Sequence, residues 1–391
     1  MWIEKTFAKL GYTYMGLRGK SKSDFGNGKP YIPYMNIFGN ERVDSGNFEY
    51  VQVGRGERQN AVAVGDALFT TSSETPEEVG MSSVLTEDVG TVYLNSFCFG
   101  LRLYRPSELD PVFLSYALRS EHIRKQMRVA AQGSTRHNLS KQNFNRMTLC
   151  YPEDVSEQRR IADVLKSADD AIFASRALVK KYADVKVGLM QGLLGRGERI
   201  SFGTVTEDKF QYGLNAAAMP FDGENSYLRI TDIDESTRKF SKLDIKSPSG
   251  KLTDAYLLAE NDIVFARTGA SVGKTYIYNP DDGIIYFAGF LVRCRVSTAY
   301  CAKYIFYQTL TNDYKRWVIV NSQRSGQPGI NATQYEKYEF NCPPLSEQKR
   351  IVEILTAADH RLSTEQNHLT KLNNIKQGLM NDLLKGVHTN D

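Results

Sequence analysis

A long segment of this chain occurs twice, and this repetition constrains the fold more than any other feature of the sequence. Residues 156–194 begin SEQRRIADVL and end GLMQGLL, and residues 346–384 begin SEQKRIVEIL and end GLMNDLL. The segments align without a gap at an offset of 190, and 15 of the 39 aligned positions are identical. Self-similarity at a fixed spacing is the signature of a duplicated architecture. We therefore expect two copies of one structural unit.

The segments that precede each copy also correspond, though more loosely. YIPYMNI at 31–37 aligns with YLRITDI at 227–233, and GDALF at 65–69 aligns with NDIVF at 261–265, both at an offset of 196. The whole chain is therefore interpreted as an alternation of variable and helical blocks. These are a first variable block (residues 1–150), a central helical block (151–197), a second variable block (198–341) and a C-terminal helical block (342–391).

Both helical blocks carry a heptad pattern that starts at their first isoleucine. In the central block the a positions are Ile161, Ala168, Ser175, Tyr182 and Leu189, and the d positions are Leu165, Ile172, Val179, Lys186 and Leu193. In the C-terminal block the a positions are Ile351, Ala358, Glu365, Leu372 and Leu379, and the d positions are Leu355, Leu362, Leu369, Lys376 and Leu383. A heptad sustained over more than four repeats predicts long helices that pack as a coiled coil.

The two predicted helices can pair within one chain or between chains. A plain dimerisation coiled coil is one interpretation, but the in-register repeat favours pairing within the chain. Because the second variable block can return the chain to the start of the first helix, we expect the pair to be antiparallel. A seam lysine usually extends its ammonium group to solvent, but matched ones suggest a surface kept for a partner protein. The predicted partner-binding residues are Lys186, Leu189, Met190, Lys376, Leu379 and Met380.

Each variable block mixes short β-like runs with one predicted helix, which spans about 110–128 in the first block and about 297–320 in the second. Blocks of about 140 residues have the right size for globular domains. The predicted fold class is α+β. It comprises two globular α/β domains joined by two long antiparallel helices, which form an intramolecular coiled coil, and the chain is a pseudo-two-fold repeat.

Basic residues cluster at matching places in the two variable blocks. Residues 119–146 carry seven basic side chains against one acidic one, and residues 293–324 carry six against one. A charge run is usually a solvated face, but neutralisation of DNA phosphates requires such clusters. Because Arg124–Lys125 falls opposite Lys315–Arg316 in the repeat, we predict that Arg124, Lys125, Lys315 and Arg316 contact phosphates.

A polar loop that contains glycine follows each basic cluster, at 132–138 and at 323–331. Arginine, glutamine and asparagine side chains can make bidentate contacts with the edges of guanine or adenine in the major groove. Two such loops in equivalent places predict duplicated readers of DNA bases. The predicted base-reading residues are Gln132, Ser134, Arg136, Asn138, Gln323, Arg324 and Gln327.

Other classes of site are not expected. Residues 269–275 resemble a phosphate-binding loop, but three residues instead of four separate its glycines. Asn341-Cys-Pro-Pro344 resembles a methyltransferase signature, but it lacks the leading proline and the aromatic residue, and no GxGxxG motif is present. The five histidines are scattered and the five cysteines form no CxxC pair, which predicts neither a metal site nor disulfides. We therefore predict no catalytic residue, metal or cofactor, and we expect no export signal or membrane span.

The arrangement of the blocks resembles the specificity subunit of type I restriction-modification enzymes over nearly the whole chain. The most specific parts are Ser156-Glu-Gln-Arg-Arg-Ile161 with Gly188-Leu-Met190, and Pro343-Pro-Leu-Ser-Glu-Gln-Lys-Arg-Ile351 with Gly378-Leu-Met380. Ala266-Arg-Thr-Gly269 with Gly273-Lys274 also resembles a turn common in the recognition domains of that family. This likeness makes Arg267 and Lys274 candidate DNA contacts, whereas the first variable block has Phe69-Thr-Thr-Ser-Ser73 in that place.

The resemblance implies a non-catalytic subunit in the cytoplasm that recognises double-stranded DNA. Each target-recognition domain would read one half of a split sequence, and the paired helices would set the distance between the halves. Two modification (methyltransferase) subunits would dock on the helices, and a separate motor-nuclease restriction subunit would supply cleavage. Two other classes stay open, a stand-alone two-lobed nuclease and a structural coiled-coil scaffold. Incubation of the purified chain with magnesium and DNA tests for the nuclease, because cleavage would favour it.

Overall fold

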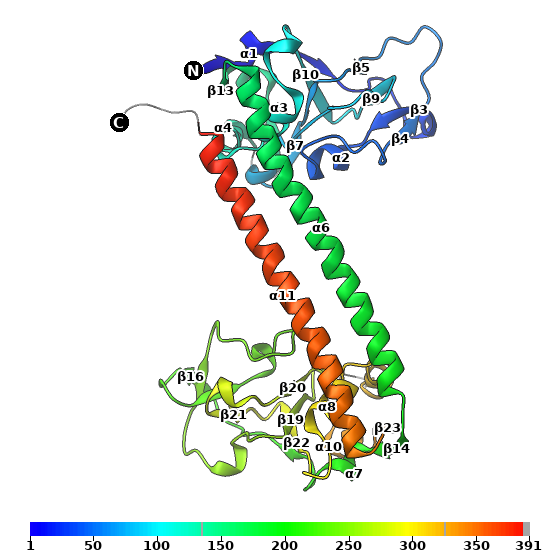
Figure 1. Cartoon of the computed structure of the whole chain (residues 1–391), viewed down its shortest axis with the longest axis vertical. Helices are drawn as coiled ribbons and strands as arrows, with labels where there is room; N and C mark the ends of the chain where they lie inside the picture. The colour runs from blue at the N-terminus through cyan, green and yellow to red at the C-terminus, as the bar shows by residue number, and fades with distance from the viewer. Residues whose placement is uncertain (134–135, 324–325, 386–391) are drawn as a thin grey trace. The chain divides into compact units, whose positions relative to one another are not determined.

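The structure of the chain is a computed structural model that describes residues 1–133, 136–323 and 326–385. It divides into two compact units, unit 1 (Met1–Arg176 with Asn367–Asp391) and unit 2 (Ala177–Gln366). Two long helices, α6 (Val155–Leu194) and α11 (Leu345–Leu383), each contribute one end to each unit (Figure 1). The mixture of helices and strands in both units confirms the predicted α+β class.

The described residues of unit 1 form short helices and four small sheets. The helices are α1 (Phe7–Leu10), α2 (Tyr34–Gly39), α3 (Pro111–Ala117), α4 (Glu121–Ala130) and α5 (Lys141–Arg146). The sheets are β1 (Trp2–Thr6) with β13 (Thr148–Pro152); β2 (Gly11–Met15), β10 (Cys98–Leu103), β6 (Ala67–Thr70) and β8 (Ser82–Val84); β4 (Glu49–Val51), β3 (Phe25–Ile32), β9 (Val92–Leu94) and β5 (Ala61–Val62); and β11 (Ala131–Gln132), β12 (His137–Leu139) and β7 (Ser72–Ser73).

Unit 2 repeats much of this plan. Its helices are α7 (Phe202–Val205), α8 (Ala302–Gln308), α9 (Asn312–Asn321) and α10 (Ala332–Glu336). Its sheets are β14 (Glu198–Ser201) with β23 (Glu339–Cys342); β15 (Gln211–Tyr212), β22 (Leu291–Arg295), β19 (Asp262–Ala266) and β20 (Thr275–Ile277); β16 (Ala218–Pro220) with β18 (Lys246–Pro248); and β17 (Ser226–Leu228) with β21 (Ile285–Phe287).

The duplication extends through the variable blocks at the level of strand register. The four-stranded sheet β2-β10-β6-β8 corresponds to β15-β22-β19-β20, and the pair β1–β13 corresponds to β14–β23. A parallel pair also recurs, with Tyr31 opposite Tyr93 in unit 1 and Tyr227 opposite Tyr286 in unit 2. The two units therefore share the topology of these elements although their variable blocks have diverged in sequence.

The ends of the long helices are part of the core of each unit. The core of unit 1 includes Ile161 and Leu165 of α6 and, from the end of the chain, Met380 and Leu384. At the positions related to these by the offset of 190, Ile351, Leu355 and Leu194 belong to the core of unit 2, and the half-buried Met190 packs against it. Equivalent helix surfaces therefore support both variable blocks.

The two long helices run antiparallel within each unit, as predicted. The first turns of α6 share a core with the last turns of α11 in unit 1, and the last turns of α6 share a core with the first turns of α11 in unit 2. Every a and d position assigned from the heptad is buried or half-buried. The predicted seam is therefore confirmed.

The predicted single helices of the variable blocks are wrong in detail, because each is two helices. In unit 1 the chain breaks after α3 at Leu118, and Ser120 occupies the N-cap position of α4. In unit 2 Thr311 interrupts the helix, because its hydroxyl accepts a hydrogen bond from the backbone N–H of Tyr314 and so begins α9. A side chain that caps a new helix competes with continuation of the preceding one.

Candidate nucleic-acid interface

The first polar loop is attached to the edge of a strand in unit 1. Strand β12 pairs with β7, and the backbone N–H of Leu139 donates to the carbonyl oxygen of Thr71 at 2.9 Å. Gln132, Arg136 and Asn138 are exposed on this loop. The fourth predicted reader, Ser134, lies outside the described residues.

The second polar loop is attached at the corresponding place in unit 2. The N–H of Ile330 donates to the carbonyl oxygen of Arg267 at 2.9 Å, and the N–H of Gly269 donates to Pro328 at 3.0 Å. Gln323 and Gln327 are exposed, whereas Arg324 lies outside the described residues. The two loops are therefore hydrogen-bonded to equivalent segments, Thr71 after β6 and Arg267 after β19, as the sequence repeat predicts.

Arg267 lies at the edge of a hollow in unit 2 that has a volume of about 600 Å³. Its Nε donates to the carbonyl oxygen of Gly289 at 3.0 Å, and its guanidinium carbon lies 5.1 Å from the centre of the Tyr212 ring. These two contacts fix the plane of the guanidinium group beside the hollow. A fixed guanidinium group is suited to bidentate contacts with a base or a phosphate.

The basic helices offer three of the four predicted phosphate contacts to solvent. Lys125 is exposed on α4, and Lys315 and Arg316 are exposed on the first turns of α9. Arg316 forms an ion pair with Asp313 at 2.5 Å, in which both side chains are more than three-quarters exposed. Exposed pairs of this kind are weak, so Arg316 can exchange its carboxylate partner for a phosphate at little cost.

The prediction for Arg124 is wrong, because this side chain is buried. Only 9% of it is exposed, and its guanidinium group donates to the carbonyl oxygens of Glu77, Val79 and Gly80 at 2.6–3.0 Å. Burial lowers the pKa of Arg124 to about 10. Arg124 therefore holds a turn against α4.

Lys274 is also committed within the fold, which corrects its assignment as a DNA contact. Its side chain is 8% exposed, and Nζ donates to the carbonyl oxygen of Ile233 at 3.2 Å. The same ammonium group forms an ion pair with Glu235 at 2.7 Å. The resemblance of this turn to a family pattern therefore marks a structural lysine.

Two matched clusters of lysine, aspartate and tyrosine occupy the helical seam. In unit 1, Lys376 Nζ lies 2.7 Å from a carboxylate oxygen of Asp169, and the hydroxyl of Tyr116 donates to the same carboxylate at 2.5 Å. In unit 2, Lys186 lies 2.6 Å from Asp359, which accepts from Tyr307 at 2.7 Å. These clusters fasten each variable block to the helices.

The clusters correct part of the predicted partner-binding surface. Lys376 also pairs with Glu41 at 2.7 Å, and Met380 is buried in the core of unit 1, so neither is offered to a partner. Lys186, Leu189, Met190 and Leu379 are half-buried along the seam. For these four residues, contact with a partner stays a prediction.

The glutamine of each SEQ motif has a structural role that sequence reasoning missed. Gln158 is fully buried, and it donates to the carbonyl oxygens of Pro152 and Glu108 while accepting from the N–H of Asp110. Gln348 is 1% exposed and repeats this arrangement with Pro343 and Cys301. Each glutamine thus joins the start of a long helix to the variable block, and its exact recurrence in the repeat was the available signal.

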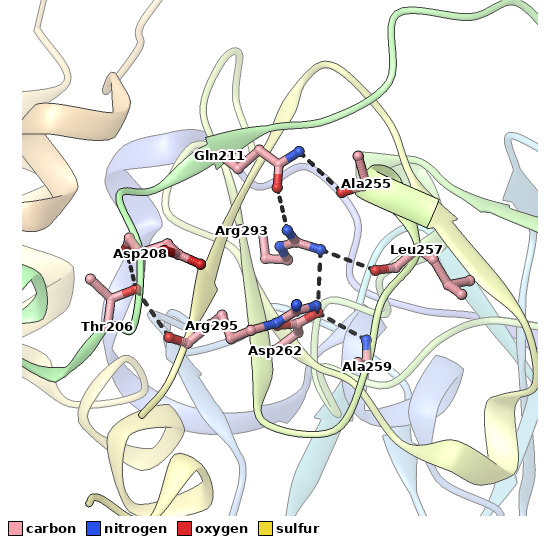
Figure 2. A network of polar contacts seen from close by, with 9 residues as sticks. All are labelled: Thr206, Asp208, Gln211, Ala255, Leu257, Ala259, Asp262, Arg293 and Arg295. Atoms are coloured by element: carbon pink, nitrogen blue, oxygen red, sulfur yellow. Dashed lines mark hydrogen bonds and ion pairs between the residues drawn. The ribbon is translucent and has the colours of Figure 1, made fainter. Parts of the chain in front are cut away.

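A buried ionic network in unit 2 was also missed (Figure 2). Asp262 is fully buried, and Arg295 donates to both of its carboxylate oxygens at 2.8 Å. Arg293 lies 3.6 Å from the same carboxylate and donates to the carbonyl oxygen of Leu257. Asp66 and Arg102 form the equivalent pair in unit 1, at 2.6 and 2.9 Å. Both aspartates occupy matched positions of the GDALF and NDIVF segments, so this aspartate–arginine pair belongs to the shared fold.

The described part of the chain offers no group of three His, Cys, Asp or Glu side chains placed to hold a metal ion. Among the helices in that same part, none has the length and hydropathy required to cross a membrane. Among the predicted DNA contacts in the described residues, those of the two loops, Lys125 of α4 and Lys315 and Arg316 of α9 are exposed, and Arg267 is half-buried. This set is suited to an extended anionic ligand.

A sequence model of the type I restriction modification DNA specificity domain matches the chain twice, over residues 21–178 and 217–376. The specificity subunit of the type I restriction enzyme StySPI from Salmonella potsdam is 21% identical over 390 residues, which cover 92% of this chain and 83% of that protein. A putative type I restriction enzyme specificity subunit, MjaX from Methanocaldococcus jannaschii, is 28% identical over 168 residues, which cover 41% of this chain and 39% of that protein.

Solved structures share the fold. The S subunit of the type I restriction-modification system of M. genitalium superimposes with a TM-score of 0.58 at 14% identity, and the match covers 99% of this chain and 97% of that one. A chain from a structure described as the basis of complex assembly and conformational transition of the type I R-M system gives a TM-score of 0.62 at 15% identity, with 98% of each chain covered.

Proposed function

The chain belongs to the family of type I restriction-modification DNA specificity domains, and we propose that it reads a bipartite DNA site, one half with each variable block. The observation that carries the proposal is that the family match occurs twice, once for each variable block. The exposed polar loops, attached to equivalent strands, support the same assignment. On this proposal the chain supplies specificity and performs no catalysis itself.

The other parts of the proposal concern partners. Two modification subunits, which methylate adenine, would dock along the helical seam, and motor-nuclease subunits would join them for cleavage in the cytoplasm. The names of the relatives support this, since they are subunits of type I restriction enzymes. A stand-alone nuclease is not favoured by any cluster of acidic residues among those that the structure describes.

Mapping of methylated adenines in cells that carry this chain with its modification subunits tests the proposal. We expect a split site, in which two short specific sequences flank a nonspecific spacer of fixed length. Methylation at a single continuous sequence, or methylation that does not depend on this chain, contradicts the proposal. DNA cleavage by the purified chain with magnesium would favour the nuclease instead.

The spacer should depend on the helices. Insertion of four residues after Ala174 in α6 lengthens that helix by about one turn, roughly 6 Å. We expect the spacer to change in length while both specific sequences persist, because readers held on rigid elements fix the spacing of half-sites. Mapping of the methylated sites measures this. Phe173→Ala, which changes a residue that is 77% exposed without altering helix length, is the control. An unchanged spacer shows that another element sets the distance.

Lys315 and Arg316 should contact phosphates, which position the protein without reading the sequence. Replacing both by Ala should weaken the binding of cognate and mismatched duplexes alike. It should also flatten the dependence of log K on log salt by about 1.8, since each phosphate contact contributes about 0.9. A salt titration of the complex with modification subunits measures both effects. The control removes the exposed Lys180 and Lys181 of α6, which lie outside the variable blocks.

The neighbouring loop should behave differently. Gln327→Ala should relax discrimination at one position of one half-site by about 1–3 kcal/mol, the contribution of one bidentate contact. It should leave the salt dependence unchanged. If the Lys315/Arg316 variant instead lost discrimination at a single base, the assignment of α9 to the DNA backbone would be wrong. If neither variant changes binding or discrimination, this surface faces solvent and does not contact DNA.

A further inference from the structure

Each unit exposes one phenylalanine at the same turn of the shared fold. Phe97 is 60% exposed in unit 1, and Phe290 is 62% exposed in unit 2. The N–H of Thr71 donates to the carbonyl oxygen of Phe97 at 3.1 Å, and the N–H of Arg267 donates to that of Phe290 at 3.1 Å. Thr71 and Arg267 each follow directly on the matched strands β6 and β19. The two phenylalanines are therefore structurally equivalent.

A glycine packs against each turn from the other side. Gly16 and Gly213 follow strands β2 and β15, and they donate to the residues after the phenylalanines, Cys98 and Leu291, at 3.1 Å. A Cβ atom on either glycine would lie 2.0–2.2 Å from a carbonyl oxygen of the turn. The backbone that presents the phenylalanine is thus held on both sides in both units.

The exposed phenylalanines adjoin the polar loops. Thr71 and Arg267, whose N–H groups donate to the phenylalanine carbonyls, also accept hydrogen bonds from the polar loops. The carbonyl oxygen of Thr71 accepts from Leu139, and that of Arg267 accepts from Ile330. In unit 2, Phe290 also borders the hollow that contains Arg267 and Tyr212. Each phenylalanine therefore belongs to the same exposed surface as the predicted base readers.

Folding does not account for this recurrence. The turns read Asn95-Ser96-Phe97-Cys98 and Ala288-Gly289-Phe290-Leu291, and the phenylalanine is the single residue that they share. A lone exposed apolar residue is ordinary on a protein surface. The same aromatic residue at the same turn of two otherwise different loops, next to a polar loop in both units and to Arg267 in unit 2, indicates a ligand with an apolar feature among polar ones.

We propose that Phe97 and Phe290 each contact the methyl group of a thymine in the major groove of the half-site that its unit reads. This inference rests on the proposed function, in which the adjoining loops enter the major groove. There the bases present hydrogen-bonding groups and one apolar group, the C5-methyl of thymine, which accepts contacts from phenylalanine. The polar loop residues would read the neighbouring base edges.

The test compares the wild-type complex and its Phe290→Ala variant, each with modification subunits, on cognate duplexes in which uracil replaces one thymine at a time. Uracil lacks only the methyl group. At one thymine of the second half-site, we expect the wild type to bind about fourfold more weakly, as for one apolar carbon group returned to water. Phe290→Ala should bind the thymine duplex about tenfold more weakly and show no further loss with uracil. Phe97→Ala should do the same in the first half-site.

The control is Leu243→Ala, which removes an apolar side chain that is 97% exposed in unit 2 and does not line the hollow beside Phe290. It should bind as the wild type does. Since Phe290 is largely exposed, its replacement should leave the thermal unfolding temperature unchanged, which confirms that folding is intact.

The possible outcomes distinguish failure of this inference from failure of the proposed function. If the wild-type complex does not discriminate cognate from mismatched duplexes, the proposed function fails. If it discriminates but Phe290→Ala and Phe97→Ala bind as it does, the inference alone fails. Loss of binding in the variants without an effect of uracil at any thymine places the rings elsewhere on DNA and also overturns the inference.

Discussion

The Asp262→Ala variant is expected to lose about 3–5 kcal/mol of stability in unit 2, which is a large part of the roughly 5–15 kcal/mol of a typical domain. Asp262 is fully buried and neutralises two arginines on the neighbouring strand β22, Arg293 and Arg295 (Figure 2). Most of the loss should come from Arg293, because its side chain is 10% exposed and burial already lowers its pKa. Without this carboxylate, the largely buried side chain of Arg293 loses its nearest counter-charge, which lies 3.6 Å away.

Hydrogen exchange measured separately for each unit tests this expectation, because a chain of two units need not unfold in a single step. Amides of β19 and β22 should lose protection in Asp262→Ala, while those of unit 1 should keep theirs. Asp313→Ala is the matched control, because it also breaks an ion pair with an arginine, but one that is exposed. Its cost should stay within about 0.5 kcal/mol. Equal protection in both variants contradicts a stabilising role for the network.

The position of Asp262 shows which features the sequence repeat predicts and which it does not. Asp66 and Asp262 align in the sequence, so a shared role could be predicted. The residues around the two aspartates differ, however. In unit 1, Tyr14 donates to Asp66 and lies opposite Gly100, where a Cβ atom would lie 2.2 Å from the Tyr14 ring. In unit 2, the corresponding pair of opposite residues is Gln211 and Arg293. Such exchanges depend on neighbours across a sheet, which a single sequence does not identify.

The helical half of the fold could be predicted because its signal is local. The heptad runs along the sequence, and its a and d positions are buried or half-buried throughout. Charge patterns gave a less reliable prediction. Arg124 and Lys125 are adjacent and look alike in the sequence, but one is buried among carbonyl oxygens and the other is exposed. The side to which a short helix turns depends on its tertiary contacts, so only part of the candidate interface could be predicted.

A chain in which a second copy of residues 2–151 replaces residues 198–341 should read the first half-site twice and lose the second entirely. The expected change in affinity for the second half-site is large, because specific sites are bound about 10³–10⁷ times more tightly than nonspecific DNA. Methylation mapping in cells that carry the variant with modification subunits measures it. The reciprocal chain, with residues 198–341 in place of 2–151, is the matched control and should read the second half-site twice.

The helix surfaces give a reason to expect that the duplicated chain folds. The first block packs on Ile161, Leu165, Met380 and Leu384, and the second block packs on the residues 190 positions away from these. The fastening clusters match as well: in the duplicated chain, the copied Tyr116 would meet Asp359, the ion-pair partner of Lys186, where Tyr307 does now. A folded variant that still methylates the original split site would show that the variable blocks do not carry the specificity. A site altered in both halves would show that they do not act separately.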